Sequence, residues 1–188
     1  MISKFISQVW ADYSWYSKSK NPFAFMLRLI LHPYFQLLFI FRILTNFSRA
    51  GGGKILLLPL LIYYRILSWL CQIELPVTVK LGKGATFVHY GPRTFHGRAI
   101  IGDFCEFYPC CLIGGQRGKG TPILGSHIFL GYGSKVIGRV CVGDYVFVCP
   151  NSVIVKDIES DSVVSGIPAK AISKRGKENV TLYDQTNR

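Results

Sequence analysis

Residues 124–159 divide into six consecutive six-residue units: LGSHIF, LGYGSK, VIGRVC, VGDYVF, VCPNSV and IVKDIE. An aliphatic residue opens every unit, and glycine follows it in three of them. A period of six is too short for a repeat made of helices. It predicts a triangular coil, in which each unit supplies one short strand and one corner. Three units then complete a turn that rises by about 4.8 Å, and the opening aliphatic side chains stack inside.

The same pattern occurs earlier in a weaker form, as LGKGAT at 81, IGDFCE at 101 and FYPCCL at 107. Its phase breaks between Ile113 and Leu124, where GGQRGKGTP interrupts the coil. We expect this basic, glycine-rich segment to leave one corner as a loop, either closing over a substrate or simply protruding. The sequence therefore predicts a mainly β domain, a parallel β-helix over residues 74–172, followed by a polar C-terminal tail over 173–188.

Residues 1–73 form a different region, apolar and basic, which we expect to be α-helical. Two helix-length stretches stand out, NPFAFMLRLILHPYFQLLFIFRILTNF and ILLLPLLIYYRILSWLCQI. Asn21 followed by Pro22 is typical of a helix start, because proline suits the first helical position. Gly51–Gly53 predicts a turn between the two stretches.

Charged residues interrupt the apolar stretches too often for a membrane span. The run between Arg28 and Arg42 is clearly shorter than a span, since a spanning helix needs about 20 mostly apolar residues. Two alternatives remain open for residues 21–73: helices lying on an anionic membrane face, or helices packed against the protein or a neighbouring subunit. The cations of this region that could meet headgroups are Lys18, Lys20, Arg28, Arg42, Arg49, Lys54 and Arg65.

The composition narrows the possible partners. The chain has 188 residues, a formal net charge of +12 and 49% hydrophobic residues, so it is not a disordered tail. The positive charge favours phosphate as a ligand: a phosphorylated cofactor, an anionic membrane or nucleic acid. Nucleic acid is not expected, because no aromatic-basic platform or reading helix is visible.

Six cysteines without a CxxC pair indicate reduced, buried thiols. With no signal-peptide pattern at the N-terminus, they favour a cytoplasmic location, at the inner face of the cytoplasmic membrane if the helices bind lipid.

Residues 74–172 resemble the left-handed β-helix hexapeptide-repeat acyltransferases of the serine acetyltransferase type. The resemblance rests on IELPVTVKLGKGATFVHYGP, IGGQRGKGTPILG, LGYGSKVIGRVCVGDYVFVCPNSVIVKDI and SGIPAKAI. Within that type the chain looks most similar to the enzymes that acetylate colanic acid or capsular polysaccharide. The resemblance implies the left-handed winding, acetyl-CoA as co-substrate and a homotrimer with its sites between subunits.

The resemblance also implies a catalytic pair. His89 in FVHYGP matches the general base of the family, and Glu74 in IELP matches the carboxylate that orients it. The chemistry agrees, because neutral imidazole can remove a hydroxyl proton and a carboxylate can hold the ring in the right tautomer. Glu74 precedes His89 by slightly less than the three units of a full turn, so we expect the two side chains to meet. The alternative for His89 is a corner histidine bonded to a neighbouring carbonyl.

Three residues are expected to contact the acceptor: His96, Arg93 and Thr121. For His96 a plain surface role is an open alternative. Serine-specific members of the family carry an Arg-His pair before the proline of the loop, where this chain has Gly120 and Thr121. This departure favours a sugar hydroxyl over serine as the acceptor.

The predicted function is therefore acetyl-CoA-dependent O-acetylation of a sugar or glycan in surface polysaccharide biosynthesis. Serine O-acetylation for cysteine biosynthesis is one alternative. A non-catalytic, membrane-attached β-helix scaffold is the other.

The resemblance and the basic charge also suggest which residues hold acetyl-CoA. Tyr132 and Pro150 are separated by three complete units, hence one stands above the other in the coil. The expected donor-binding residues are Gly115, Tyr132, Lys135, Pro150, Lys156, Lys170 and Lys174. No metal is expected, because the spacing of His89, His96 and His127 along the chain does not resemble that of a three-histidine zinc site.

Overall fold

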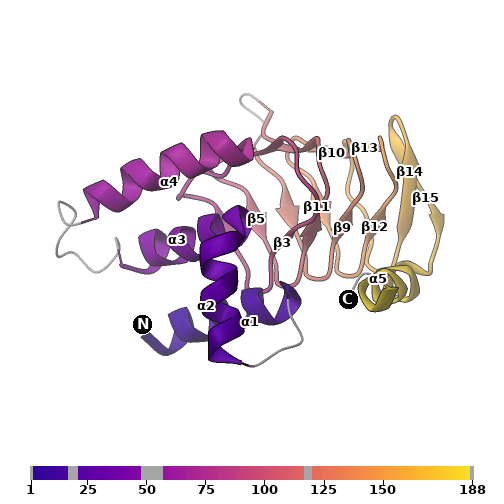
Figure 1. Cartoon of the computed structure of the whole chain (residues 1–188). Coiled ribbons are helices and arrows are strands. Elements are labelled where there is room, and N and C mark those ends of the chain that lie inside the picture. The colour runs from indigo at the N-terminus through magenta and orange to yellow at the C-terminus, as the bar shows by residue number, and fades with distance from the viewer. Residues whose placement is uncertain (1, 17–20, 48–56, 117–119, 187–188) are drawn as a thin grey trace.

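The computed structural model describes residues 2–16, 21–47, 57–116 and 120–186. It consists of a helical region at one end of a long coil of short strands, with one further helix at the opposite end of the coil (Figure 1). The predicted fold, a parallel β-helix preceded by apolar helices, is confirmed. The expected turn at Gly51–Gly53 and the cations Lys18, Lys20, Arg49 and Lys54 lie outside the described residues.

The helical region divides differently from the prediction. The helices are α1 (Ile2–Tyr16), α2 (Pro22–Leu31), α3 (Pro33–Phe47), α4 (Leu58–Cys71) and, at the C-terminal end, α5 (Gly176–Thr186). Asn21 begins α2 as expected, since its side chain accepts a hydrogen bond of 2.9 Å from the N–H of Phe23. The first apolar stretch, however, is two helices. His32 has extended backbone angles (φ −111°, ψ 99°), because the proline that follows disfavours the helical conformation.

The coil has three faces, each a sheet of short strands. Face A has the order β1-β4-β7-β10-β13, face B β11-β8-β5-β2 and face C β15-β14-β12-β9-β6-β3. The strands are β1 (Ile73–Glu74), β2 (Lys80–Leu81), β3 (Thr86–Phe87), β4 (Arg93–Phe95), β5 (Ile100–Ile101), β6 (Glu106–Phe107), β7 (Cys111–Gly114), β8 (Ile123–Leu124), β9 (Phe129–Leu130), β10 (Lys135–Ile137), β11 (Cys141–Val142), β12 (Phe147–Val148), β13 (Val153–Ile154), β14 (Val163–Gly166) and β15 (Ala169–Ser173). All pairs are parallel except the closing hairpin β14–β15.

The six-residue period accounts for the interior of the coil. Ile123 pairs with Cys141 and Phe129 with Phe147, so a regular turn contains three of the six-residue units. Every aliphatic residue that opens a unit is at most 3% exposed; these residues are Leu124, Leu130, Val136, Val142, Val148 and Ile154. Stacking these side chains removes them from water in the way the pattern predicts.

Two irregular turns are longer than three units. Phe95 pairs with Ile113, which is a regular turn, whereas the turn that joins Phe87 to Phe107 is longer by two residues. The two additional residues lie between β3 and β4, around His89. The turns that include the segment between β7 and β8 are longer by five residues, as the pairing of Ile101 with Leu124 shows. The coil thus departs from its regular period at the two segments that the sequence marks as candidate sites.

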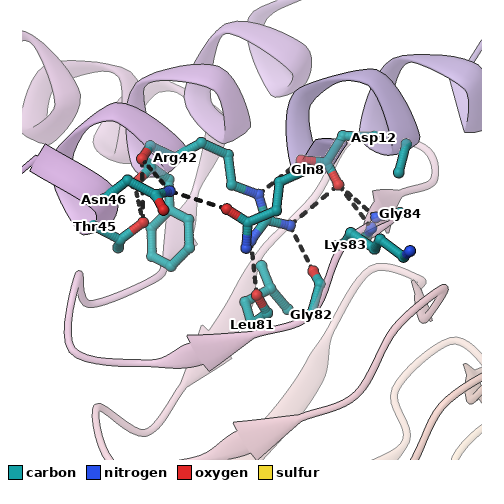
Figure 2. Close-up of polar contacts among 12 residues, drawn as sticks. Gln8, Asp12, Arg42, Thr45, Asn46, Leu81, Gly82, Lys83 and Gly84 are labelled. Carbon is teal, nitrogen blue, oxygen red and sulfur yellow. Dashed lines mark hydrogen bonds and ion pairs between the residues drawn. The ribbon is translucent and has the colours of Figure 1, made fainter. Parts of the chain in front are cut away.

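A buried ion pair joins the helices to the first turn of the coil (Figure 2). The guanidinium of Arg42 in α3 donates to both carboxylate oxygens of Asp12 in α1, at 2.8 and 3.1 Å, and to the carbonyls of Leu81 and Gly82. Asp12 also accepts from the backbone N–H groups of 84–85. Burial raises the pKa of the Asp12 carboxyl, while Arg42 and these N–H groups act in the opposite direction. This network fixes the helices against the coil.

Candidate active site

His89 lies at the exposed corner between β3 and β4. Its imidazole stacks on the ring of Tyr132, with centroids 5.9 Å apart and planes 26° apart, and lies 5.7 Å from the ring of Tyr108. The structure therefore brings the predicted base together with one predicted donor-binding residue. The exposed ring can meet a substrate from the solvent side.

The same corner continues up the coil as a column that we call the corner ladder. Its members are His89, Pro109, Tyr132 and Pro150. The N–H of Gly133 donates to the carbonyl of Pro109 at 2.9 Å, and the N–H of Asn151 donates to that of Tyr132 at 2.7 Å. Pro150 therefore stands one turn above Tyr132, as their separation by three units predicts. Such a column could carry a long, extended ligand along the coil.

The backbone of His89 does not by itself mark a catalytic residue. Its φ is +59°, but Cys110 on the next turn and His127 at another corner have similar values, +62° and +57°. His127 is packed between aromatic rings, 5.2 Å from Phe104 and 4.5 Å from Tyr145. The left-handed corner is therefore a feature of the coil, and His127 offers a matched control for His89.

Arg93 does not lie where an acceptor could reach it, which corrects its predicted role. The residue is 1% exposed. Its guanidinium donates to the carbonyls of Phe107, Gly91, Val88 and His89. A buried cation with its donors occupied by carbonyls has little capacity left for a substrate. Arg93 is instead a positioning residue that holds the segment carrying His89.

Glu74 and His89 are not hydrogen-bonded in the structure, although the sequence predicts that their side chains meet. Glu74 is exposed in β1 and pairs with Thr94, which follows His89 by five residues. The turn between Glu74 and Thr94 is longer than a regular one by two residues. His89 therefore lies five residues before the position above Glu74, instead of the three that a regular turn would give. Glu74 lines a cavity of about 570 Å³ together with Arg65 and Trp69.

The other predicted acceptor residues do come together beside the loop. His96 Nδ1 accepts a hydrogen bond of 3.2 Å from the N–H of Arg98, and Thr121 Oγ1 donates to the carbonyl of the same residue at 3.2 Å. A neutral His96 ring therefore carries its proton on Nε2. Gly115, predicted as a donor residue, lies between them: a Cβ there would be 3.0 Å from His96 Nε2 and 3.1 Å from Thr121 Cγ2. Only glycine leaves this contact unstrained.

The structure adds a residue that the sequence analysis does not identify, Arg139. A Cβ on Gly120 would lie 3.1 Å from Arg139 Cβ, so the arginine stem packs on the loop. Arg139 is exposed and lines a cavity of about 610 Å³ with Gly115 and Gln116. It stands one regular turn above Thr121, in the register that also places Cys141 beside Ile123. This separation by three units is the signal that could have revealed it.

The predicted donor-side lysines are distributed over several elements. Lys135 in β10 donates to the carbonyl of Gly133 at 2.8 Å, and Lys174 pairs with Glu159 at the surface. Lys156 follows β13 and Lys170 lies in β15, both exposed. Among the described residues, no group of three His, Cys, Asp or Glu side chains is arranged to hold a metal ion.

Comparison with known sequences finds serine acetyltransferases as relatives. No family model matches the chain. The serine acetyltransferase of Synechococcus elongatus is 32% identical over 139 residues, covering 62% of this chain and 57% of that protein. That of Helicobacter pylori is 33% identical over 114 residues, covering 58% and 66%. The chain thus spans less than two thirds of the length of these relatives.

Solved structures of serine acetyltransferases have a similar fold. Neisseria gonorrhoeae serine acetyltransferase in complex with serine has a TM-score of 0.72 at 20% identity, covering 89% of this chain and 69% of that one. Soybean serine acetyltransferase has a TM-score of 0.75 at 19% identity, covering 90% and 69%. The match includes the helical region as well as the coil.

The expected sugar acceptor is contradicted by these findings, because every relative and structure named above is a serine acetyltransferase. The likeness to the polysaccharide-modifying group is likewise not supported. The Gly120–Thr121 departure does not exclude serine, since the stem of another cation, Arg139, packs on the loop. The chain has the left-handed parallel β-helix fold of these solved structures, and its sequence is similar to that of serine acetyltransferases.

Proposed function

We propose that the chain transfers an acetyl group from acetyl-CoA to the hydroxyl of L-serine. The observation that carries the proposal is the exposed His89 imidazole stacked on Tyr132 at the corner ladder. The serine acetyltransferase relatives support the acceptor, and a serine acetyltransferase of the same fold has been solved with CoA, at a TM-score of 0.72 and 18% identity.

The reaction assigns a role to each group at the corner. The serine hydroxyl oxygen attacks the thioester carbonyl while His89 takes the hydroxyl proton. The tetrahedral intermediate then collapses, the carbon–sulfur bond breaks, and the imidazolium returns the proton to the leaving thiolate of CoA. Tyr132 and Pro150 line the path of the pantetheine arm. The loop between β7 and β8 is at a different corner from His89, so the backbone N–H groups that stabilise the oxyanion come from the loop of the neighbouring copy. We infer a homotrimer, in which a neighbouring copy completes the groove along the exposed ladder.

The serine carboxylate requires a cation, and we propose Arg139 of the partner subunit for it, because within one chain Arg139 lies between faces A and B and His89 between faces C and A. It stands over the loop beside His96 and Thr121, and its exposed guanidinium has no ion-pair partner among the described residues. A guanidinium suits a carboxylate because its two N–H groups match the two oxygens. His96, with its proton on Nε2, is placed to donate a further hydrogen bond to the acceptor.

The proposal is tested by thiol release from acetyl-CoA by the full chain, with L-serine, D-serine, L-threonine and a panel of free and nucleotide-linked sugars as acceptors. We expect release that depends on L-serine and a product with the mass of O-acetylserine. Release with a sugar and none with serine would contradict the proposed acceptor. Absence of release with any of them, together with no calorimetric binding of CoA, would contradict the acetyltransferase itself.

Replacing Arg139 by Gln is expected to raise the KM for L-serine by roughly 10- to 100-fold, because a hydrogen bond to a charged group is worth about 1.5–3 kcal/mol. The KM for acetyl-CoA should stay within about twofold of wild type. The control is Arg175→Gln, an exposed arginine just before α5. An unchanged KM for serine in Arg139→Gln would show that the carboxylate is held elsewhere.

Cys110 provides a chemical probe of the ladder. It follows Pro109 and is exposed, whereas burial raises the pKa of Cys105 to about 12 and that of Cys71 to about 11, so those thiols should react slowly. N-ethylmaleimide should abolish acetyl transfer by the wild type. The treated Cys110→Ser variant should keep at least about ten times the activity of the treated wild type. CoA should protect, and Cys141→Ser, which removes the exposed thiol of β11, should remain sensitive. Equal inactivation of the Cys110 variant would remove this corner from the donor path.

A further inference from the structure

The N-terminal helical region carries almost exclusively positive charge. Residues 1–73 contain eight Lys or Arg residues and a single acidic residue, Asp12. That aspartate is 1% exposed and is engaged by Arg42 inside the protein. No carboxylate in this region is therefore available to offset the positive charge at the surface.

Helix α4 exposes an apolar stripe along its length. Leu58, Ile62, Ile66 and Leu70 recur at every fourth position and are 49–62% exposed, so they lie on one face of the helix. Trp69, beside this stripe, is 78% exposed. The opposite face of α4 packs into the protein through Tyr64, Leu67 and Cys71. A continuous row of large apolar side chains is therefore exposed to water in the folded chain. Such an exposed row is typical of a surface that binds a membrane or another protein.

Helix α2 is exposed in the same way, and none of its residues is buried. Its large exposed side chains are Phe23, Met26, Leu27, Ile30 and Leu31. Their spacing of three and four residues places them on one face. Burial and the neighbouring Arg28 lower the pKa of His32, which ends this helix.

Gln36 of α3 links the end of α2 to the middle of α4. The side-chain amide of Gln36 donates to the carbonyl of Ile30 at 2.7 Å and accepts from the hydroxyl of Tyr63 at 3.2 Å. The end of α2 and the middle of α4 are thereby joined, and the polar groups at the junction satisfy one another. We call the combined surface of α2 and α4 the apolar face; in Figure 1 both helices lie at the end of the molecule away from α5.

The lengths and burial of these helices favour an orientation along a membrane surface over one that crosses the membrane. No single described helix is long and apolar enough to cross a membrane; α2 and α3 pass such a test only as a pair, bent by 101°. Helix α3 packs in the protein core, where eight of its side chains are buried. The exposed Arg65 lies within the stripe of α4, and Trp69 follows it by one helical turn, an arrangement suited to the headgroup region.

We propose that the apolar face binds the surface of an anionic lipid bilayer, with α2 and α4 lying in the plane of the interface. The apolar side chains enter the boundary of the acyl chains, and Arg28 and Arg65 remain at the level of the lipid phosphates. Because Arg65 and Trp69 also line the cavity that contains Glu74, the bilayer would lie beside the first turn of the coil. This inference is independent of the proposed acetyl transfer.

Flotation with vesicles tests the proposal, using the full chain with vesicles of phosphatidylcholine alone and of phosphatidylcholine with roughly 30% phosphatidylglycerol, an anionic content at which basic segments bind. We expect flotation with the anionic vesicles, at least about tenfold weaker partitioning on neutral ones, and release as salt is raised. Ile66→Ser and Ile30→Ser should each weaken partitioning about tenfold or more, and Arg65→Gln about fivefold.

The matched control is Ile172→Ser, which removes an isoleucine as exposed as Ile30 from β15 at the other end of the coil and should float like wild type. A blue shift of tryptophan fluorescence on vesicle addition, absent in Trp69→Phe, would place α4 at the interface. Equal binding to neutral vesicles would overturn the role of charge. No binding at all, with Ile66→Ser and Ile30→Ser lowering the oligomeric mass in light scattering, would overturn the proposal by showing that a second copy covers the face.

Discussion

His89→Ala is expected to lower kcat for serine acetylation by about 10²- to 10⁴-fold, the usual loss when a general base is removed. The expected cause is specific: the imidazole is the titratable ring that stacks on Tyr132 at the exposed corner. The KM values for serine and acetyl-CoA should change little, because His89 acts mainly in the transition state. The measurement is steady-state thiol release at saturating concentrations of both substrates.

His127→Ala is the matched control for that result. His127 has nearly the same backbone conformation, with φ of +57° against +59°, but its ring is enclosed by Phe104 and Tyr145. Its replacement should lower the melting temperature and leave kcat within about threefold of wild type. Comparable losses of kcat in both variants would mean that the corner contributes structure and not catalysis.

Arg42→Met is expected to lower the free energy of unfolding by about 3–5 kcal/mol, because it leaves the Asp12 carboxylate buried without its cation. The guanidinium also satisfies the carbonyls of Leu81 and Gly82, which would lose their donor. Arg42→Lys should recover little of the loss, since an ammonium cannot reproduce the two-pronged contact with Asp12. Urea unfolding, followed by circular dichroism, measures each difference.

Lys174→Met breaks the exposed ion pair with Glu159 and provides the comparison. Its urea midpoint should match that of wild type, because exposed pairs contribute little to stability. Equal midpoints for Arg42→Met and wild type would show that the helices are not held to the coil through this network.

The interior of the coil could be predicted from the sequence because its determinants are local and repeated. Each opening aliphatic residue from Leu124 to Ile154 points inward for the same reason, so six repetitions support one another. The start of α2 at Asn21 is similarly local, since the cap and its partner are two residues apart. The break at His32 could also have been read from Pro33, but the apolar pattern continues across it and suggests a single helix.

The candidate site was less predictable because its contacts join distant parts of the chain. Arg93 carries a charge and follows the predicted base, which suggests a substrate contact, yet it is buried among backbone carbonyls that no sequence pattern displays. The relation of Glu74 to His89 depends on two additional residues at one corner, which shift the position above Glu74 to Thr94. Arg139 meets the loop only through the stacking of successive turns.

A crystal structure of the protein with CoA and L-serine tests the central claim most directly. We predict that the CoA sulfur lies within about 4 Å of the His89 imidazole, close to the separation of reacting atoms. The pantetheine arm should follow Tyr132 and Pro150, and the serine carboxylate should face Arg139 of the partner subunit. A CoA molecule bound away from the corner ladder, with His89 in contact with neither ligand, would contradict the account.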